Sequence, residues 1–153
     1  RAPPPHPTPP PSHLPAPDGQ EGAALAADAP ARLGEAGTNG PPGVVIVEGL
    51  ADFLQSAADG PMQDMIKRVV ANGHLVVSEG EPMALSGLQP LSQAARASRV
   101  GVVLQPEQTD GVLFRAQFPR VRKTDFPPGR ALYVTKAGLP VTVQLALAGS
   151  ATR

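Results

Sequence analysis

The uneven distribution of proline most limits what this chain can fold into. Twelve of the 20 prolines lie in residues 1–42. Residues 1–17 have the composition of a stiff polyproline spacer, and residues 18–42 are rich in Ala and Gly with few large apolar side chains to bury. We therefore expect residues 1–42 to be a disordered linker, with at most a transient helix at Ala23–Ala27. An alternative role is a docking site for a proline-binding module.

Residues 43–148 remain to build a core, which is enough chain for one small domain, and residues 149–153 form a tail. The absence of Cys excludes a disulfide framework and a thiolate metal site, and the three His are too scattered for metal-ligand spacing. No apolar run approaches the roughly 20 residues that span a bilayer. Because the sequence begins at Arg1 and has no signal-peptide pattern, we expect a piece of a longer protein.

Charge is divided along the chain, although the formal net charge is zero. Residues 1–95 hold ten acids and four bases, whereas residues 96–153 hold nine bases and three acids. A basic C-terminal half can meet the phosphates of a nucleotide or a nucleic acid. The alternative is that these bases cover a solvated surface and pair with the acidic half.

Short β-branched runs alternate with amphipathic stretches in residues 43–147. The runs at 44–47, 74–78 and 100–104 predict strands buried on both faces. Helices are predicted at 50–57, 61–70 and 88–97, and a short helix or turn at 107–114. This order predicts an α/β fold with one mostly parallel sheet. A terminal β-hairpin, formed by 131–135 and 141–147, would extend the edge of that sheet.

Ligands of open α/β sheets bind outside the carboxyl ends of the strands. The predicted parallel strands end at Glu48-Gly49, Ser78-Glu79 and Gln105-Pro106. Glu48 closes a run of four β-branched residues, as does the acid that holds magnesium in nucleotide hydrolases. The alternative is that it only caps the next helix. The chain has no Gly-x-x-x-x-Gly-Lys-Ser/Thr loop, so it offers no recognisable phosphate cradle.

Two other features have structural interpretations. His74 and Ser78 share one strand at a spacing of four residues, but a buried strand does not offer a nucleophile's geometry. His74 is therefore predicted to be a structural residue. The turn Pro127–Arg130 has the composition that a tight loop demands.

Four segments, taken in order, resemble the C-terminal half of an FtsK/SpoIIIE-type motor domain, a hexameric RecA-like ATPase that pumps DNA. The resemblance is closest to divergent actinobacterial members related to the type VII secretion ATPases, and it covers residues 43–148. The four segments are VVIVEGLADFL (44–54), GHLVVSEGEP (73–82), RASRVGVVLQPEQTDGVLF (96–114) and FPPGRALYV (126–134). The resemblance implies a partial RecA-like P-loop NTPase sheet that lacks its P-loop half.

The resemblance also implies roles for individual residues, with ATP and Mg²⁺ as cofactors. Glu48 would hold Mg²⁺ through water at the end of the Walker B strand, and Arg99 would act as a finger towards a neighbouring subunit. The implied nucleotide-contacting positions are Glu48, Ser78, Glu79, Gly129 and Arg130. Two departures predict degenerate catalysis. Gly49 replaces the second acid of the family's pair, and Glu79-Gly80 replaces the Thr-Gln that senses the γ-phosphate.

Three hypotheses about function follow. The leading one is a fragment of an ATP-dependent translocase for DNA segregation and cell division or for secretion, whose substrate is DNA or secreted protein. The resemblance implies a hexameric homo-oligomer on the cytoplasmic side, associated with the membrane through upstream segments. This hypothesis requires Val44, Leu75 and Val102 to lie on one parallel sheet. The rival is a non-hydrolysing regulatory or substrate-docking module. The third is direct DNA binding by the basic segment 115–136, which predicts a steep salt dependence.

Overall fold

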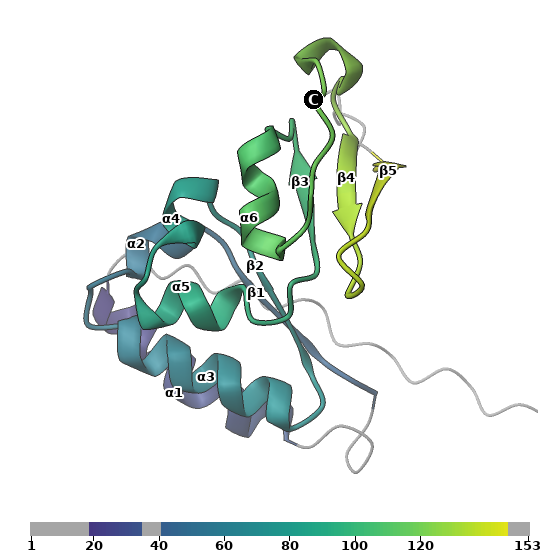
Figure 1. Ribbon diagram of the computed structural model, residues 1–153. Helices are drawn as coiled ribbons and strands as arrows, with labels where there is room; N and C mark the ends of the chain where they lie inside the picture. Colours follow the sequence, from purple (N-terminus) through teal and green to yellow (C-terminus); the bar gives the residue numbers. More distant parts are fainter. Residues whose placement is uncertain (1–18, 35–40, 147–153) are drawn as a thin grey trace, which may run out of the picture.

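The computed structural model describes residues 19–34 and 41–146, which form two small sheets and the helices packed against them (Figure 1). None of the described helices is long and apolar enough to cross a membrane. Two 3₁₀ turns lie at 108–110 and 123–125. The helices and strands are α1 (Gly19–Leu33), β1 (Val44–Val47), α2 (Leu50–Phe53), α3 (Asp59–Ala71), β2 (Leu75–Ser78), α4 (Pro82–Ser86), α5 (Pro90–Ala95), β3 (Gly101–Leu104), α6 (Gly111–Phe114), β4 (Arg130–Val134) and β5 (Pro140–Gln144).

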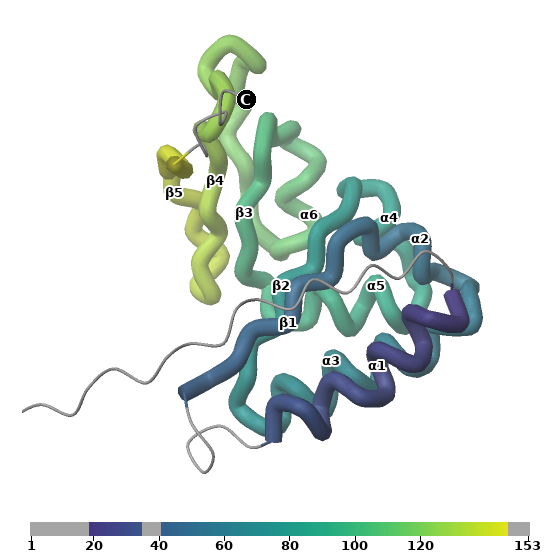
Figure 2. Tube along the Cα trace, turned by 180° about the vertical axis from the view of Figure 1, so that it is seen from behind, coloured from purple at the N-terminus to yellow at the C-terminus, as the bar shows by residue number. Residues whose placement is uncertain are grey.

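Helix α1 lies in the segment that the sequence predicts to be disordered. Its buried residues Gly22, Ala26 and Pro30 recur every four positions and so share one face, and α1 packs alongside α3 (Figure 2). Small residues let the elements approach closely: a Cβ on Gly22 would lie 2.8 Å from Cε1 of Phe53. The prediction of a disordered linker is therefore wrong for Gly19–Leu33. Residues 1–18 and 35–40 lie outside the described residues.

Strands β1 and β2 form a parallel pair, as predicted, in the register Val44↔Leu75 to Val47↔Ser78. Helix α3 connects them. Four of the five residues of its predicted apolar face, Met62, Met65, Ile66 and Val69, are buried, whereas the fifth, Val70, is 56% exposed. The four buried side chains form a first core with Val47 of β1, Leu50 of α2 and Leu91 of α5. Helices α2 and α5 are shorter than predicted, and α4 lies in a segment for which no helix was predicted.

The face of this parallel sheet that points away from the first core is open. Val44 and Ile46 of β1 are 53% and 65% exposed, and Leu75 and Val77 of β2 are 55% and 44% exposed. The prediction that these strands are buried on both faces is therefore wrong. Helices cover only one face, although parallel sheets are normally covered on both.

Strand β3 does not join the parallel sheet. It pairs antiparallel with β4, in the register Gly101↔Val134 to Leu104↔Ala131, and β4 pairs with β5 in the predicted hairpin. The prediction of one mostly parallel sheet is therefore wrong for this strand. Val103 of β3 packs into a second core with Leu132 of β4 and the rings of Phe118 and Phe126. Strand β3 therefore belongs to the sheet of the β4–β5 hairpin and not to the sheet of β1 and β2.

Candidate functional site

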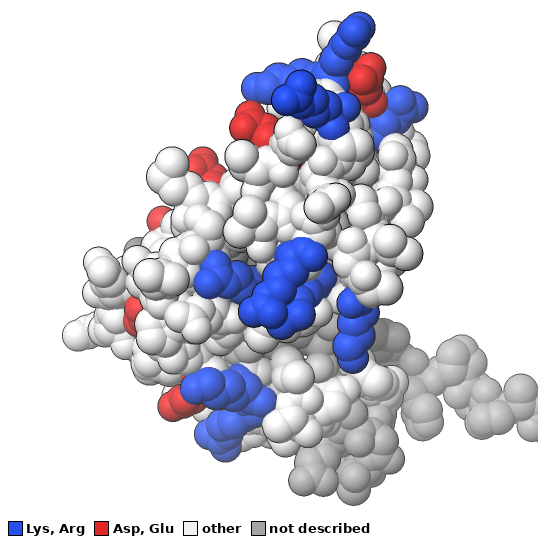
Figure 3. Space-filling model, viewed as in Figure 1, with Lys and Arg blue, Asp and Glu red and all other residues white. Residues whose placement is uncertain are grey.

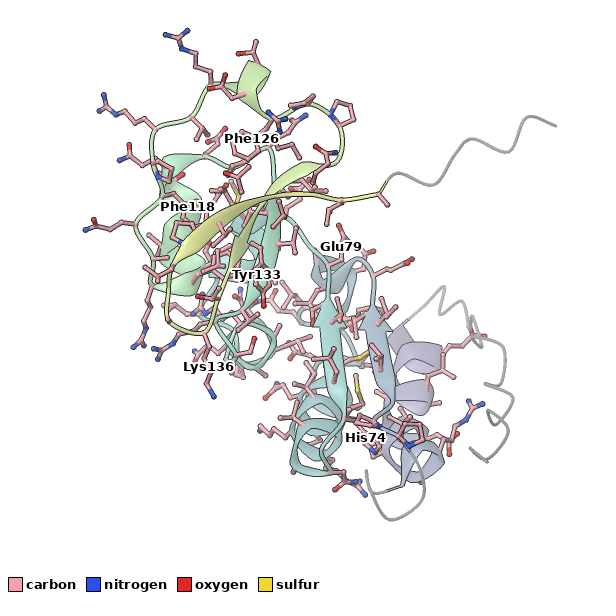
Figure 4. The ribbon with its side chains drawn as sticks, turned by 90° about the vertical axis from the view of Figure 1, so that its right-hand side faces the viewer. His74, Glu79, Phe118, Phe126, Tyr133 and Lys136 are labelled. Carbon is pink, nitrogen blue, oxygen red and sulfur yellow. The ribbon has the colours of Figure 1, made fainter. Side chains whose placement is uncertain are left out.

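The carboxyl ends of β1 and β2 bring three of the predicted site residues together, namely Glu48, Ser78 and Glu79. Because Val47 and Ser78 are register partners, Glu48 and Glu79 follow them side by side at the same edge of the sheet. Both acidic side chains are exposed, and Ser78 is half-buried. Figure 4 shows Glu79 at this end of the sheet.

Glu79 ties the loop after β1 to the loop after β2. The backbone N–H of Gly49 donates to Oε2 of Glu79 at 2.9 Å, and the N–H of Leu50 donates to the Glu79 carbonyl oxygen at 3.0 Å. The N–H of Glu79 in turn donates to the carbonyl oxygen of Val47 at 2.8 Å. The Gly49 amide is thus occupied by a carboxylate and the Leu50 amide by a backbone carbonyl, and the carboxylate would repel a phosphate placed there.

Gly49 itself is in the left-handed conformation, with φ of 60°, which glycine adopts without steric cost. A Cβ at this position would lie 2.9 Å from Oδ2 of Asp52. Glycine at position 49 therefore suits this tight loop.

Glu48, the predicted magnesium ligand, lacks a surrounding ligand set. Within residues 19–34 and 41–146, no group of three or more His, Asp or Glu side chains is arranged to hold a metal ion. The neighbouring Glu79 carboxylate already accepts the Gly49 amide. A water-mediated Mg²⁺ site at Glu48 stays a prediction.

The remaining predicted site residues lie at opposite ends of the antiparallel sheet. Arg99 precedes β3 by two residues, beside the Gly101↔Val134 pair, whereas Gly129 and Arg130 lie at the start of β4. A strand the length of β4 spans about 13 Å. The Arg130 side chain donates from Nη1 to the Asp125 carbonyl oxygen at 3.2 Å, so it helps to close its own turn. The structure does not bring Arg99 and Arg130 into one site.

His74 is a structural residue, as the sequence predicts. It is 7% exposed, and its Nδ1 accepts the Gly43 N–H at 3.0 Å. Its Nε2 lies 2.9 Å from the Gly34 carbonyl oxygen. Because Nδ1 is an acceptor, Nε2 is the protonated nitrogen and donates to Gly34. The ring therefore joins the end of α1 to the start of β1.

We expect His74→Leu to destabilise the protein by about 1–3 kcal/mol, because it leaves the Gly43 N–H and the Gly34 carbonyl without the ring as partner. Urea unfolding followed by circular dichroism measures the change. An unchanged midpoint would show that water replaces both hydrogen bonds at no cost.

Comparisons with known proteins found no match to this chain among protein-family models, curated proteins or solved structures.

Proposed function

We propose that this chain is a non-hydrolysing docking module related to the FtsK/SpoIIIE-type motor domain. The observation that carries the proposal is the Glu79 carboxylate on the Gly49 amide, at 2.9 Å. A motor domain needs a phosphate-sensing residue and a second acid at these positions. Here the Glu79 carboxylate accepts the Gly49 amide, and Gly49 stands where a motor domain has its second acid.

The relationship to the motor domain is supported by β1, β2 and the helix between them, and not by β3. The motor hypothesis requires Val44, Leu75 and Val102 on one parallel sheet. Val44 and Leu75 are register partners, but Val102 pairs with Tyr133 in the antiparallel sheet. This requirement is not met, which favours a module without motor activity over an intact half of a nucleotide site.

We expect the chain not to bind or hydrolyse ATP. Titration with a fluorescent ATP analogue in the presence of Mg²⁺ should give no saturable signal, and phosphate release should equal that of buffer. Glu48→Gln, which removes the predicted metal ligand, should behave like the parent chain. Saturable binding with a Kd below about 100 μM that Glu48→Gln weakens would contradict the proposal.

A second candidate is the C-terminal part of an ATP-dependent FtsK/SpoIIIE-like translocase. The antiparallel pairing of Val102 counts against it, and the open face of the parallel sheet counts for it. Ile46 and Leu75 are more than half exposed, as expected of strands that belong to a larger covered sheet. Reading the coding DNA upstream of Arg1 tests it. An in-frame Gly-x-x-x-x-Gly-Lys-Ser/Thr loop after a strand-like run would favour the translocase, and its absence would favour the docking module.

A further inference from the structure

Three exposed basic residues that are distant in the sequence gather at one end of the antiparallel sheet. Arg99 lies two residues before Gly101, and Lys136 lies two residues after Val134, the register partner of Gly101. Arg115 follows Phe114, whose ring lies against Gly101 so closely that a Cβ there would be 2.7 Å from it. We call Arg99, Arg115 and Lys136 the basic cluster.

The β4–β5 turn, which carries Lys136, also lies against the segment that carries Arg115. A Cβ on Gly138 would lie 3.7 Å from the carbonyl oxygen of Arg115, so the turn that carries Lys136 contacts the segment after α6. Figure 3 shows basic side chains gathered in the middle of the face of the molecule that it views, with no acidic side chain among them. Figure 4 shows Lys136 projecting from the turn.

These cations have no partner within the described part of the chain. Its ion pairs are limited to Arg32 with Asp28 in α1, and no side-chain hydrogen bond is made by any of the three cluster residues. The acids nearest in sequence cap their own turn, since the Asp110 carboxylate accepts the Glu107 N–H at 2.8 Å. Three unpaired cations at one sheet end create a positive surface.

Two of the three residues also hold unfavourable backbone conformations. Arg99 and Arg115 have φ of 55° and 52°, the left-handed region that side chains with a Cβ rarely adopt. Glycine fits such positions without strain. Strained residues of this kind concentrate at functional sites, and two of the four in the described residues, Arg99 and Arg115, belong to the basic cluster.

An exposed aliphatic side chain lies close to one of the cations in the sequence. Val112 of α6 is three residues before Arg115 and is 77% exposed. Leu139, which is 64% exposed, is hydrogen-bonded across the turn to Thr135 and so lies on the face of Tyr133 and Val141. Tyr133, the one aromatic residue among the exposed large apolar side chains of the described ranges, belongs to the sheet face opposite Val134. The surface therefore lacks the aromatic platform on which nucleic acid bases stack.

We propose that the basic cluster is the docking site for an acidic protein segment in which carboxylates alternate with aliphatic side chains. The carboxylates would pair with Arg99, Arg115 and Lys136, and the aliphatic side chains would cover Val112. Arginine suits such a site because its fork of N–H groups matches a carboxylate. This inference rests on the docking function proposed above and names its surface and its partner.

Fluorescence anisotropy with a labelled helical peptide of Glu, Leu and Ala tests the proposal, with Glu and Leu on one face. The same peptide with Gln in place of Glu is the matched probe. We expect saturable binding of the Glu peptide at low salt and at least tenfold weaker binding of the Gln peptide. Arg99→Gly/Arg115→Gly should weaken binding at least tenfold, and Lys136→Gln should weaken it about threefold.

The glycine substitutions are chosen because they remove charge and relieve strain together, so the melting temperature should stay equal or rise. The control is Gln55→Gly/Gln105→Gly, which acts on the two other left-handed non-glycine residues, with φ of 59° and 46°. It should leave peptide binding unchanged.

The proposal is overturned if the parent chain does not bind the Glu peptide, or if the double glycine variant binds it as tightly as the parent. It is also overturned if single-stranded or duplex DNA of similar length binds more tightly than the peptide through the same two arginines. None of these results depends on ATP. Failure of this inference is therefore distinguishable from failure of the proposed function, which is decided by nucleotide binding.

Discussion

Replacing Ala26 with aspartate is expected to detach α1 from α3. Ala26 is 3% exposed and lies between Gly22 and Pro30 on the buried face of α1. An unpaired carboxylate at this contact costs about 3–5 kcal/mol. A 15-residue helix is marginally stable on its own in water. Once it loses the contact with α3, α1 should therefore unfold while the remaining core persists.

Limited trypsin digestion measures this detachment, because Arg32 lies in the last turn of α1. Cleavage after Arg32 should be at least tenfold faster in Ala26→Asp than in the parent chain. Ala27→Asp is the matched control, since it makes the same chemical change at the adjacent, exposed position. Equal cleavage rates in the two variants would show that α1 is not held by this face.

The elements that sequence could predict are those with a strong period of apolar residues. The four-residue β-branched run of β1 and the apolar face of α3, at Met62, Met65, Ile66 and Val69, match the structure. Helix α1 was missed because its buried face is made by Gly22, Ala26 and Pro30, which recur regularly but carry no large apolar side chain. Small residues can still bury a helix when its partner offers large side chains.

The partner of β3 could not be predicted, because a short apolar run does not encode which strand lies beside it. Residues 101–104 suit a parallel or an antiparallel neighbour equally well. The choice depends on Phe118 and Phe126, which lie outside the strand and close the second core over Val103. Those contacts join segments that are separated by loops, and loops leave little pattern in sequence.

The candidate sites, too, could be predicted from the sequence only in part. Glu48 and Glu79 could be placed at one sheet edge, because strand ends are readable and parallel strands align their carboxyl ends. The hydrogen bond from Gly49 to Glu79 depends on loop conformation and could not be foreseen. The sequence placed Arg99, Arg115 and Lys136 in its basic half, but it could not show that they meet. They meet through the register of β3 with β4 and through the contact of Gly138 with the segment after α6.

Replacing Leu91 with alanine is expected to cost about 2–5 kcal/mol of the free energy of unfolding. Leu91 of α5 is 0% exposed and belongs to the first core, where α5 packs against α3. Its truncation removes apolar contacts and leaves a cavity that a short helix cannot close by collapsing. Against a typical total of about 5–15 kcal/mol, this single change should remove a large part of the stability.

Urea unfolding measures the Leu91→Ala effect as a lower midpoint with an unchanged slope. Leu88→Ala is the matched control, because Leu88 lies three residues earlier and is 84% exposed. It should change stability by no more than about 0.5 kcal/mol. Equal midpoints for the two variants would mean that α5 does not pack on α3. A reduced slope in Leu91→Ala would instead mean that the first core and the second core unfold separately, because the cooperative unit would then expose less surface.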